Sequence, residues 1–177
     1  EIYQEGIRVP PVALYKAGCL NKDVHEILLA NMRGPYERAA DIRAHTASLQ
    51  VAERRVSELV DRYGADGLKR YMLALIRYSE LRLQQAILDA PTGIWTAVDY
   101  LDDDLGSDVP LPIKVQISIE HQPDPRISVD FTGSGPTAKW GINVAGHGTK
   151  QMVVGVFRNL LVDDSVPINA GFLKPFT

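Results

Sequence analysis

The sequence contains a single cysteine, Cys19, which excludes a disulfide bond within the chain and suits a reducing cytoplasm. It also lacks a basic excess, because 19 lysines and arginines face 22 acidic residues and give a net charge of −3. A general nucleic-acid-binding protein normally carries a positive surface, so that class is disfavoured. No apolar run approaches the roughly 18 residues that a transmembrane helix needs. We therefore expect a cytoplasmic protein without nucleic-acid or membrane partners.

An initiator methionine and a signal-peptide pattern are also missing from the first residues, Glu1 to Gly6. From this we expect the chain to be an internal part of a longer polypeptide. What is present is ordinary for a globular protein, since 45% of the residues are hydrophobic and 23% are charged. The 177 residues are enough for one generous domain or two small ones.

The first half of the sequence predicts helices. Asn21 is placed to cap a short helix over 23–32, and an unbroken segment over 36–63 predicts a long one. Apolar residues recur every seven positions along that segment and form a seam for packing against another helix, namely Ile42, Leu49, Val56 and Tyr63. A turn is expected at 64–67, followed by a second long helix over 65–88. Two long helices joined by so few residues predict an antiparallel hairpin.

The second half changes to the alternation that is typical of strands. The segments 113–119 and 127–131 alternate apolar and polar residues and predict a hairpin with its loop at 121–125. The segment 94–101 is a third expected strand. A glycine-rich stretch then leads to a helix expected over 149–161. The predicted fold class is α+β: a long antiparallel helical hairpin followed by a small antiparallel sheet and a C-terminal helix. The predicted domains are 1–90 and 91–177.

Several phrases of the sequence occur in an order that resembles the hydantoinase B/5-oxoprolinase family. The phrases cover essentially the whole chain, and no single one is diagnostic. In chain order they are Glu5-Gly6-Ile7-Arg8-Val9-Pro10-Pro11-Val12, Ala30-Asn31-Met32-Arg33-Gly34-Pro35, Asp41-Ile42-Arg43-Ala44, Asp99-Tyr100-Leu101-Asp102-Asp103-Asp104, Val129-Asp130-Phe131-Thr132-Gly133-Ser134, Ile142-Asn143 and Ile168-Asn169-Ala170-Gly171.

This resemblance implies a part of an ATP-dependent cyclic-amide hydrolase, with both domains in one larger catalytic subunit. A nucleotide-binding A-type subunit would activate a small-molecule substrate with ATP, and the B-type subunit would complete ring opening in a hetero-oligomer. The resemblance further implies ATP and a divalent metal in the complete enzyme. The family's metal-binding His/Asp motif precedes the phrase at Glu5, so we expect no metal ligand and no bound cofactor in these residues alone.

The residues themselves suggest candidates for substrate binding, although none for the catalytic base. Asp41 and His45 share a helix face and suit an acid–base pair or two metal ligands, but His45 also follows the apolar seam, where a packed histidine is expected. Two ligands make no metal site of known geometry. Arg8 suits recognition of a carboxylate or phosphate, or is simply a surface residue. The candidate substrate-binding residues are Glu5, Arg8, Asp41, Arg43, Ser134 and Asn143.

Glycine-rich segments of the second half have alternative interpretations. The segment 141–150 lacks the Gly-Lys-Ser/Thr order of a phosphate loop, yet glycines before a helix leave backbone N–H groups that can meet an anion or a developing oxyanion. The segment 132–135 is not a nucleophile elbow, and we expect a tight turn with local hydroxyl bonding. The run Asp102–Asp104 lacks the spacing of a calcium loop and predicts an acidic, solvated turn. Cys19 is expected to be a small buried or loop thiol.

Two other functions stay open. The first is a subunit of an ATP-dependent ketone carboxylase, which His45 and the Gly146-His147-Gly148 stretch keep open because both depart from the family's usual pattern. The second is a non-catalytic interaction module, in which the helical hairpin docks partner subunits without any active site.

Overall fold

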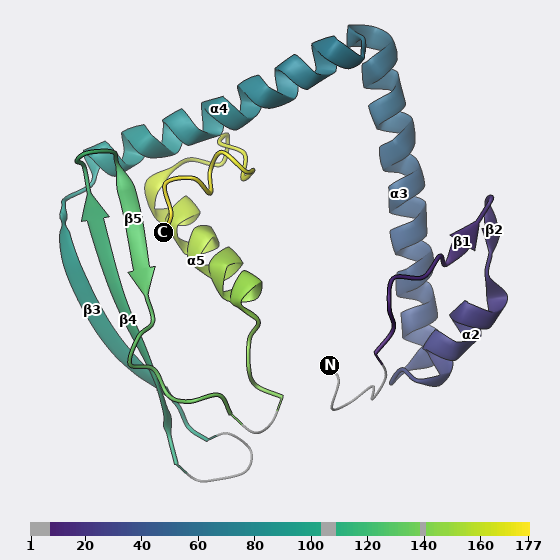
Figure 1. The fold of residues 1–177 in the computed structure, drawn as a ribbon, viewed down its shortest axis with the longest axis horizontal. Helices are drawn as coiled ribbons and strands as arrows, with labels where there is room; N and C mark the ends of the chain where they lie inside the picture. Colours follow the sequence, from purple (N-terminus) through teal and green to yellow (C-terminus); the bar gives the residue numbers. More distant parts are fainter. Residues whose placement is uncertain (1–7, 104–108, 139–140) are drawn as a thin grey trace. The chain divides into compact units, whose positions relative to one another are not determined.

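The fold was obtained as a computed structural model, which describes residues 8–103, 109–138 and 141–177 (Figure 1). The chain divides into two compact units, Glu1–Ala65 and Asp66–Thr177. The expected boundary at residue 90 thus differs from the division by contacts, because the second long helix shares a hydrophobic core with the sheet that follows it.

The first unit contains a small hairpin and two helices. Strands β1 (Tyr15–Lys16) and β2 (Cys19–Leu20) pair antiparallel. The predicted N-cap is confirmed, because the Asn21 side chain accepts a hydrogen bond from the Val24 N–H at the start of α2 (Lys22–Ala30). Helix α3 (Pro35–Tyr63) confirms the long helix, with Pro35 in its first turn and none of its residues buried.

The predicted turn over 64–67 is wrong, since a single residue, Gly64, separates α3 from α4 (Ala65–Asp89). Gly64 has φ 69°, a left-handed conformation that glycine adopts without steric cost, and its N–H donates to the Val60 carbonyl at 2.7 Å. Helical geometry therefore resumes at once. The packing of α3 against α4 stays a prediction, because the two helices belong to different units.

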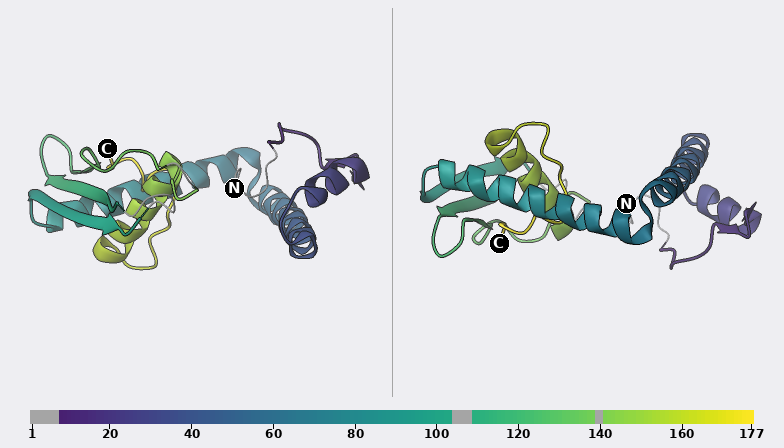
Figure 2. Two further views of the ribbon diagram at one scale, coloured as in Figure 1. Left: turned by 90° about the horizontal axis from the view of Figure 1, so that it is seen from below. Right: turned by 90° about the horizontal axis from the view of Figure 1, so that it is seen from above.

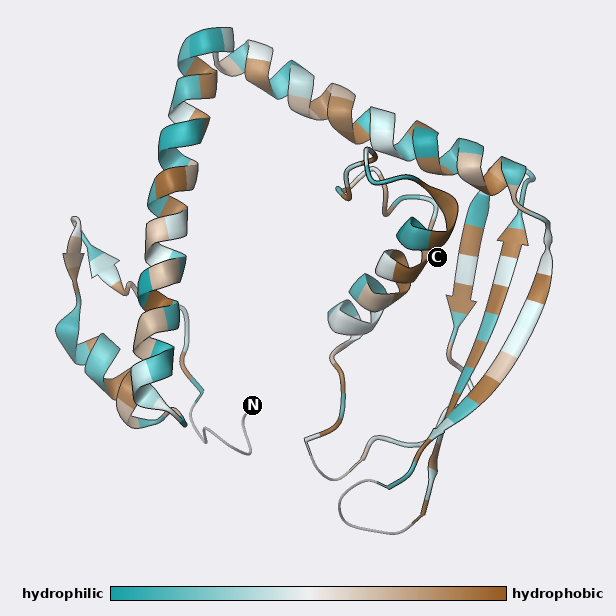
Figure 3. Cartoon of the chain, turned by 180° about the vertical axis from the view of Figure 1, so that it is seen from behind, coloured by the Kyte–Doolittle hydropathy of each residue, from teal (hydrophilic) through white to brown (hydrophobic). Residues whose placement is uncertain are grey.

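The second unit contains an antiparallel sheet in the order β3-β4-β5. Its strands are β3 (Gly93–Leu101), β4 (Leu111–Glu120) and β5 (Arg126–Asp130), which confirms all three predicted strands. Figure 3 shows the alternation of apolar and polar residues as brown and teal bands along the strands. The end of the chain lies along β5, where the Ile127 N–H donates to the Pro175 carbonyl at 2.8 Å and the Thr177 N–H donates to the Ile127 carbonyl at 3.0 Å.

The hydrophobic core of this unit joins the sheet to two helices. It consists of Leu83 and Ile87 of α4, Ile119 of β4, Ile127 of β5, Val154 and Phe157 of α5 (Gly146–Leu161), and Val166 and Phe172 of the C-terminal segment. Burying each of these side chains contributes about 1.5–3 kcal/mol. The views in Figure 2 show the C-terminal half of α4 lying alongside both the sheet and α5. The predicted α+β class is confirmed.

Helix α5 begins at Gly146, so the predicted start at Thr149 is wrong. The N–H groups of Gly148 and Thr149 both donate to the Ala145 carbonyl, at 2.8 and 3.2 Å. Glycine disfavours helix mainly in the interior, and at the first turn its cost is small enough for the helix to extend.

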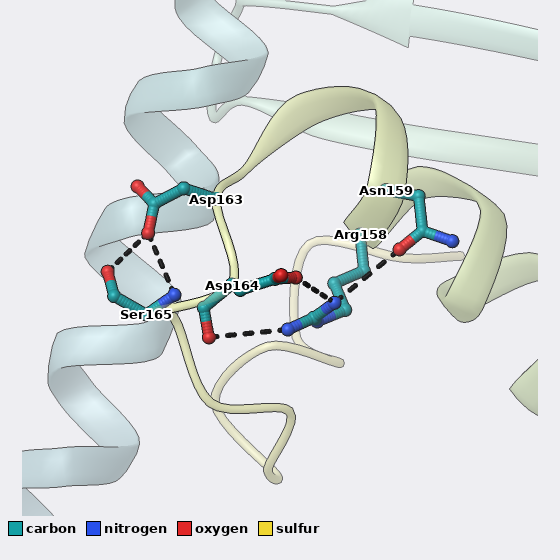
Figure 4. Close-up of polar contacts among 5 residues, drawn as sticks. All are labelled: Arg158, Asn159, Asp163, Asp164 and Ser165. Atoms are coloured by element: carbon teal, nitrogen blue, oxygen red, sulfur yellow. Dashed lines mark hydrogen bonds and ion pairs between the residues drawn. The ribbon is translucent and has the colours of Figure 1, made fainter.

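The turn after α5 is fixed by polar contacts (Figure 4). Arg158 donates to the Asp164 carboxylate at 2.7 Å, and the Ser165 N–H donates to the Asp163 carboxylate at 2.8 Å. The Ser165 hydroxyl also contacts the Asp163 carboxylate, and this hydrogen bond is the largest cause that lowers the pKa of Asp163. These contacts direct the chain back towards α4.

The C-terminal segment docks on α4 through a partly buried polar cluster. The fully buried Ser79 donates to the Pro167 carbonyl at 2.9 Å, and Asn169 donates to the Ser79 hydroxyl at 2.9 Å. The Asn169 side-chain oxygen, Oδ1, accepts the Gly171 N–H at 2.9 Å. The phrase Ile168-Asn169-Ala170-Gly171, which carried part of the family resemblance, thus holds this segment in place.

Candidate functional site

A cavity of about 840 Å³ lies within the second unit, between β4, β5, the loop after β5 and the first turns of α5. Its apolar lining includes Ile113, Val129, Phe131, Val144, Val153 and Phe176. Its size and its largely apolar walls are typical of small-molecule sites, which are concave and carry few polar groups. This cavity is the strongest candidate site among the described residues.

Ser134, one of the sequence-predicted site residues, lines this cavity from the turn after β5. Its hydroxyl accepts the Lys114 N–H at 3.0 Å and lies 2.8 Å from the Phe131 carbonyl. Just before it, Thr132 donates through its hydroxyl and its N–H to the Asp130 carboxylate, and these bonds lower the pKa of Asp130. The expected tight turn with local hydroxyl bonding is confirmed, and Ser134 continues the sheet's bonding pattern beyond β5.

Asn143 also lines the cavity, on the loop that leads to α5. Its side-chain oxygen accepts the Ala138 N–H at 2.9 Å, and its side-chain nitrogen donates to the Ala138 carbonyl at 2.7 Å. This paired contact closes the loop. Asn143 and Ser134 therefore both build the cavity wall, and direct contact of either with a substrate stays a prediction.

The first turns of α5 bring Thr149 and Lys150 to the cavity. No side chain caps the start of this helix, and no acidic residue lies in its first turn. The helix dipole and the Lys150 ammonium group therefore both contribute positive potential at this wall. Lys150 is the only ionisable side chain among the described lining residues.

The remaining predicted site residues do not line this cavity. Glu5 lies outside the described residues. Arg8, Asp41 and Arg43 are exposed residues of the first unit, and Asp41 forms an ion pair with Arg38 at 3.0 Å. His45 is exposed on α3, so the expected packed histidine is not found in this unit.

No group of three His, Cys, Asp or Glu residues in the described ranges is arranged to hold a metal ion. Within the same ranges, no helix combines the length and the hydropathy needed to cross a bilayer. Asp102 and Asp103 are exposed at the end of β3, while Asp104 lies outside the described residues. Cys19 is exposed in β2.

The cavity could not be predicted from the sequence, because its walls come from segments far apart in the chain. In the sequence, Lys150 stands out only as part of a segment that lacks the residue order of a phosphate loop. Its spacing to Val153 and Val154, three and four residues later on the same helix face, was the available signal. Phe176 carried no signal at all, because its place depends on the pairing of the C-terminal segment with β5.

Comparison with known sequences identifies one family. The sequence model of the hydantoinase B/oxoprolinase family matches residues 1–177. The B-type chain of a candidate D-/L-hydantoinase from Pseudomonas sp. (strain NS671) is 30% identical over 99% of this chain, and the match covers 31% of that relative. The chain therefore spans less than a third of this relative's length.

Two solved structures share the fold. The ATP-dependent caprolactamase from Pseudomonas jessenii superposes with a TM-score of 0.81 and 27% identity, over 100% of this chain and 30% of that one. Acetone carboxylase, in a nucleotide-free structure, superposes with a TM-score of 0.78 and 18% identity, over 92% of this chain and 23% of that one. At that identity the second match shows the fold alone.

Proposed function

The chain belongs to the hydantoinase B/oxoprolinase family, and from this premise we propose that it is part of the B-type subunit of an ATP-dependent cyclic-amide hydrolase. In the complete enzyme an A-type subunit holds the nucleotide and activates the substrate, and the B-type subunit completes ring opening. What supports this most is the match of the family over every residue of the chain, together with the likeness to a caprolactamase at a TM-score of 0.81.

The cavity between the sheet and α5 is this chain's contribution to the substrate pocket. Its apolar walls suit the hydrocarbon part of a lactam or hydantoin ring, which gains free energy on leaving water. The Asn143 and Ser134 contacts keep these walls in a fixed shape before the substrate arrives. A pocket that is already formed binds without a cost in loop ordering.

The described residues do not fit a metal site, since no suitable group of His, Cys, Asp or Glu is present among them. The segment 141–150 likewise lacks the order of residues that holds a nucleotide phosphate. In this proposal the divalent metal and ATP are therefore held by other residues of the complete enzyme.

The test is nucleotide hydrolysis by the full-length protein together with its nucleotide-binding partner. We expect caprolactam, a hydantoin or 5-oxoproline to stimulate ATP hydrolysis and to appear as the ring-opened product in mass spectra. Absence of stimulation by every cyclic amide in a broad panel would contradict the proposal.

A ketone carboxylase is the second candidate. It is favoured by 25% identity over 96% of this chain to the acetophenone carboxylase delta subunit of Aromatoleum aromaticum (strain DSM 19018 / LMG 30748 / EbN1). Consumption of acetone or acetophenone that depends on both ATP and bicarbonate would support this candidate over the hydrolase.

A further inference from the structure

We propose that the cavity binds a substrate with an apolar body and one negatively charged group, and that Lys150 is the residue that selects for that charge. This inference rests on the proposed function in one respect only, because it takes the cavity as the substrate pocket. It adds a class of substrate and a residue that determines specificity.

The apolar side chains on the cavity walls indicate that the body of the ligand is apolar. Aliphatic and aromatic side chains from the sheet, the loop after β5, α5 and the C-terminal segment face a volume of about 840 Å³. Such walls offer dispersion contacts and exclude water, and they offer no compensation for a ligand with many polar groups. A compact hydrocarbon ring is the body that fits these walls.

Two polar side chains on the walls already have backbone partners. Asn143 is paired with the Ala138 backbone, and Ser134 is paired with the backbone of Lys114 and Phe131. Ser134 cannot turn to a ligand without leaving a partly buried backbone group unpaired, which costs free energy. Among the described lining residues, Lys150 is the one whose side chain can orient a ligand by charge.

Lys150 fits that role because its charge is not compensated. Among the described residues it has no ion-pair partner, and no acidic side chain stands with it on the described cavity wall. Lys174, by contrast, is paired with Glu80 at 2.7 Å. Lys150 is an exposed residue, so water screens its ammonium group in the empty cavity, and a ligand that displaces this water strengthens the attraction for an anion.

The test measures binding by the full-length protein without ATP, using isothermal titration calorimetry. The probes are 5-oxoproline and 2-pyrrolidinone, which share a five-membered lactam ring and differ in the carboxylate. Lys150→Met removes the charge and keeps a long side chain. Lys16→Met, at an exposed lysine of β1 in the first unit, is its matched control.

We expect Lys150→Met to raise the Kd of 5-oxoproline about tenfold or more and to change the Kd of 2-pyrrolidinone by less than about twofold. Val144→Trp, at a 68% exposed lining residue, should weaken both probes by filling the cavity. Val156→Trp, at a 56% exposed position of α5 that does not line the cavity, should weaken neither. Lys16→Met should bind like the wild type.

Three results would overturn the inference: wild-type protein that does not bind 5-oxoproline, equal loss of both probes in Lys150→Met, or unchanged binding in Lys150→Met and Val144→Trp. Unchanged binding in both variants is also the result expected if another segment of the parent polypeptide fills the cavity. Turnover of a cyclic amide with unchanged binding in both variants would remove this inference and leave the proposed function. The expected binding pattern without turnover of any cyclic amide would support this inference and contradict the proposed function.

Discussion

Gly171 lies where the C-terminal segment comes closest to helix α4. A Cβ atom built on Gly171 would stand 1.8 Å from the Ile76 carbonyl oxygen and 2.7 Å from its carbonyl carbon. Both neighbours are helix backbone and cannot move aside as a side chain could. This close approach allows Asn169 to reach both Ser79 and the Gly171 N–H.

Gly171→Ala should therefore destabilise the protein by about 2–4 kcal/mol, because the segment must move off α4 and release Phe172 from the core. Urea denaturation followed by circular dichroism measures the change. Gly155→Ala is the control, since nothing lies within 4 Å of a Cβ at Gly155 of α5, and it should be neutral or slightly stabilising. Equal stabilities of the two variants would show that the segment does not dock as described.

Glu80 of α4 holds the C-terminal segment against this helix through an ion pair. Its carboxylate contacts Lys174 at 2.7 Å and Arg77 at 3.0 Å, and its side chain is only 11% exposed. The hydrogen bond from Lys174 is the largest cause that lowers the pKa of Glu80 below its ordinary value of 4.5. Because the folded pKa is the lower one, the stabilisation is complete above pH 4.5 and is lost as the pH falls through the folded pKa.

We expect the wild type to be more stable than Glu80→Gln at pH 7, and the difference to shrink as the pH falls from 5 towards 3. Thermal unfolding at a series of pH values measures this. Glu53→Gln, at an exposed position of α3, should follow the wild-type curve throughout. A stability difference between wild type and Glu80→Gln that does not change with pH would show that the ionised Glu80 carboxylate does not stabilise the fold.

At the scale of elements, α3 and α4 differ in how many of their side chains are buried. Helix α3 has no buried residues, and its Leu49 is 70% exposed. Helix α4 places Leu83 and Ile87 in the core with no exposed area. Its C-terminal end is also capped, because the His121 ring nitrogen lies 2.9 Å from the Ile87 carbonyl and 3.0 Å from the Ala90 carbonyl.

Hydrogen exchange should reveal this difference. Amides of α4 around Leu83 and Ile87 open only with the whole second unit, whereas amides in the middle of α3 open locally, so we expect α3 to exchange about 100-fold faster or more. Mass spectrometry of peptides from each helix measures the rates. Amides around Val154 and Phe157 of α5 should exchange as slowly as those of α4. Similar rates in α3 and α4 would contradict the exposed state of α3.

Elements were predictable where a local pattern determines them. The alternation in β4 and the length of α3 were correctly predicted, since the period and the absence of breakers are properties of neighbouring residues. The turn over 64–67 and the start of α5 were predicted wrongly, because both helices extend through glycines that local propensity counts against them. The docking of residues 163–177 was not predicted, since it depends on contacts with α4 and β5 far back in the chain.

At the scale of the molecule, the candidate site was predictable only in part. Ser134 and Asn143 line the cavity as sequence candidates, yet both have structural partners. Arg8, Asp41 and Arg43 lie in the other unit. The chain spans 31% of one relative and 30% of the caprolactamase chain, so the rest of the catalytic machinery in our proposal comes from residues beyond this chain.

The most direct measurement of the central claim compares nucleotide hydrolysed with product formed by the full-length protein and its nucleotide-binding partner. Supplied with ATP and a cyclic amide but no bicarbonate, the assembly should form the ring-opened amino acid in proportion to the ATP hydrolysed. Nucleotide hydrolysis without ring opening, or turnover only of a ketone and only with bicarbonate, would contradict the assignment as a cyclic-amide hydrolase.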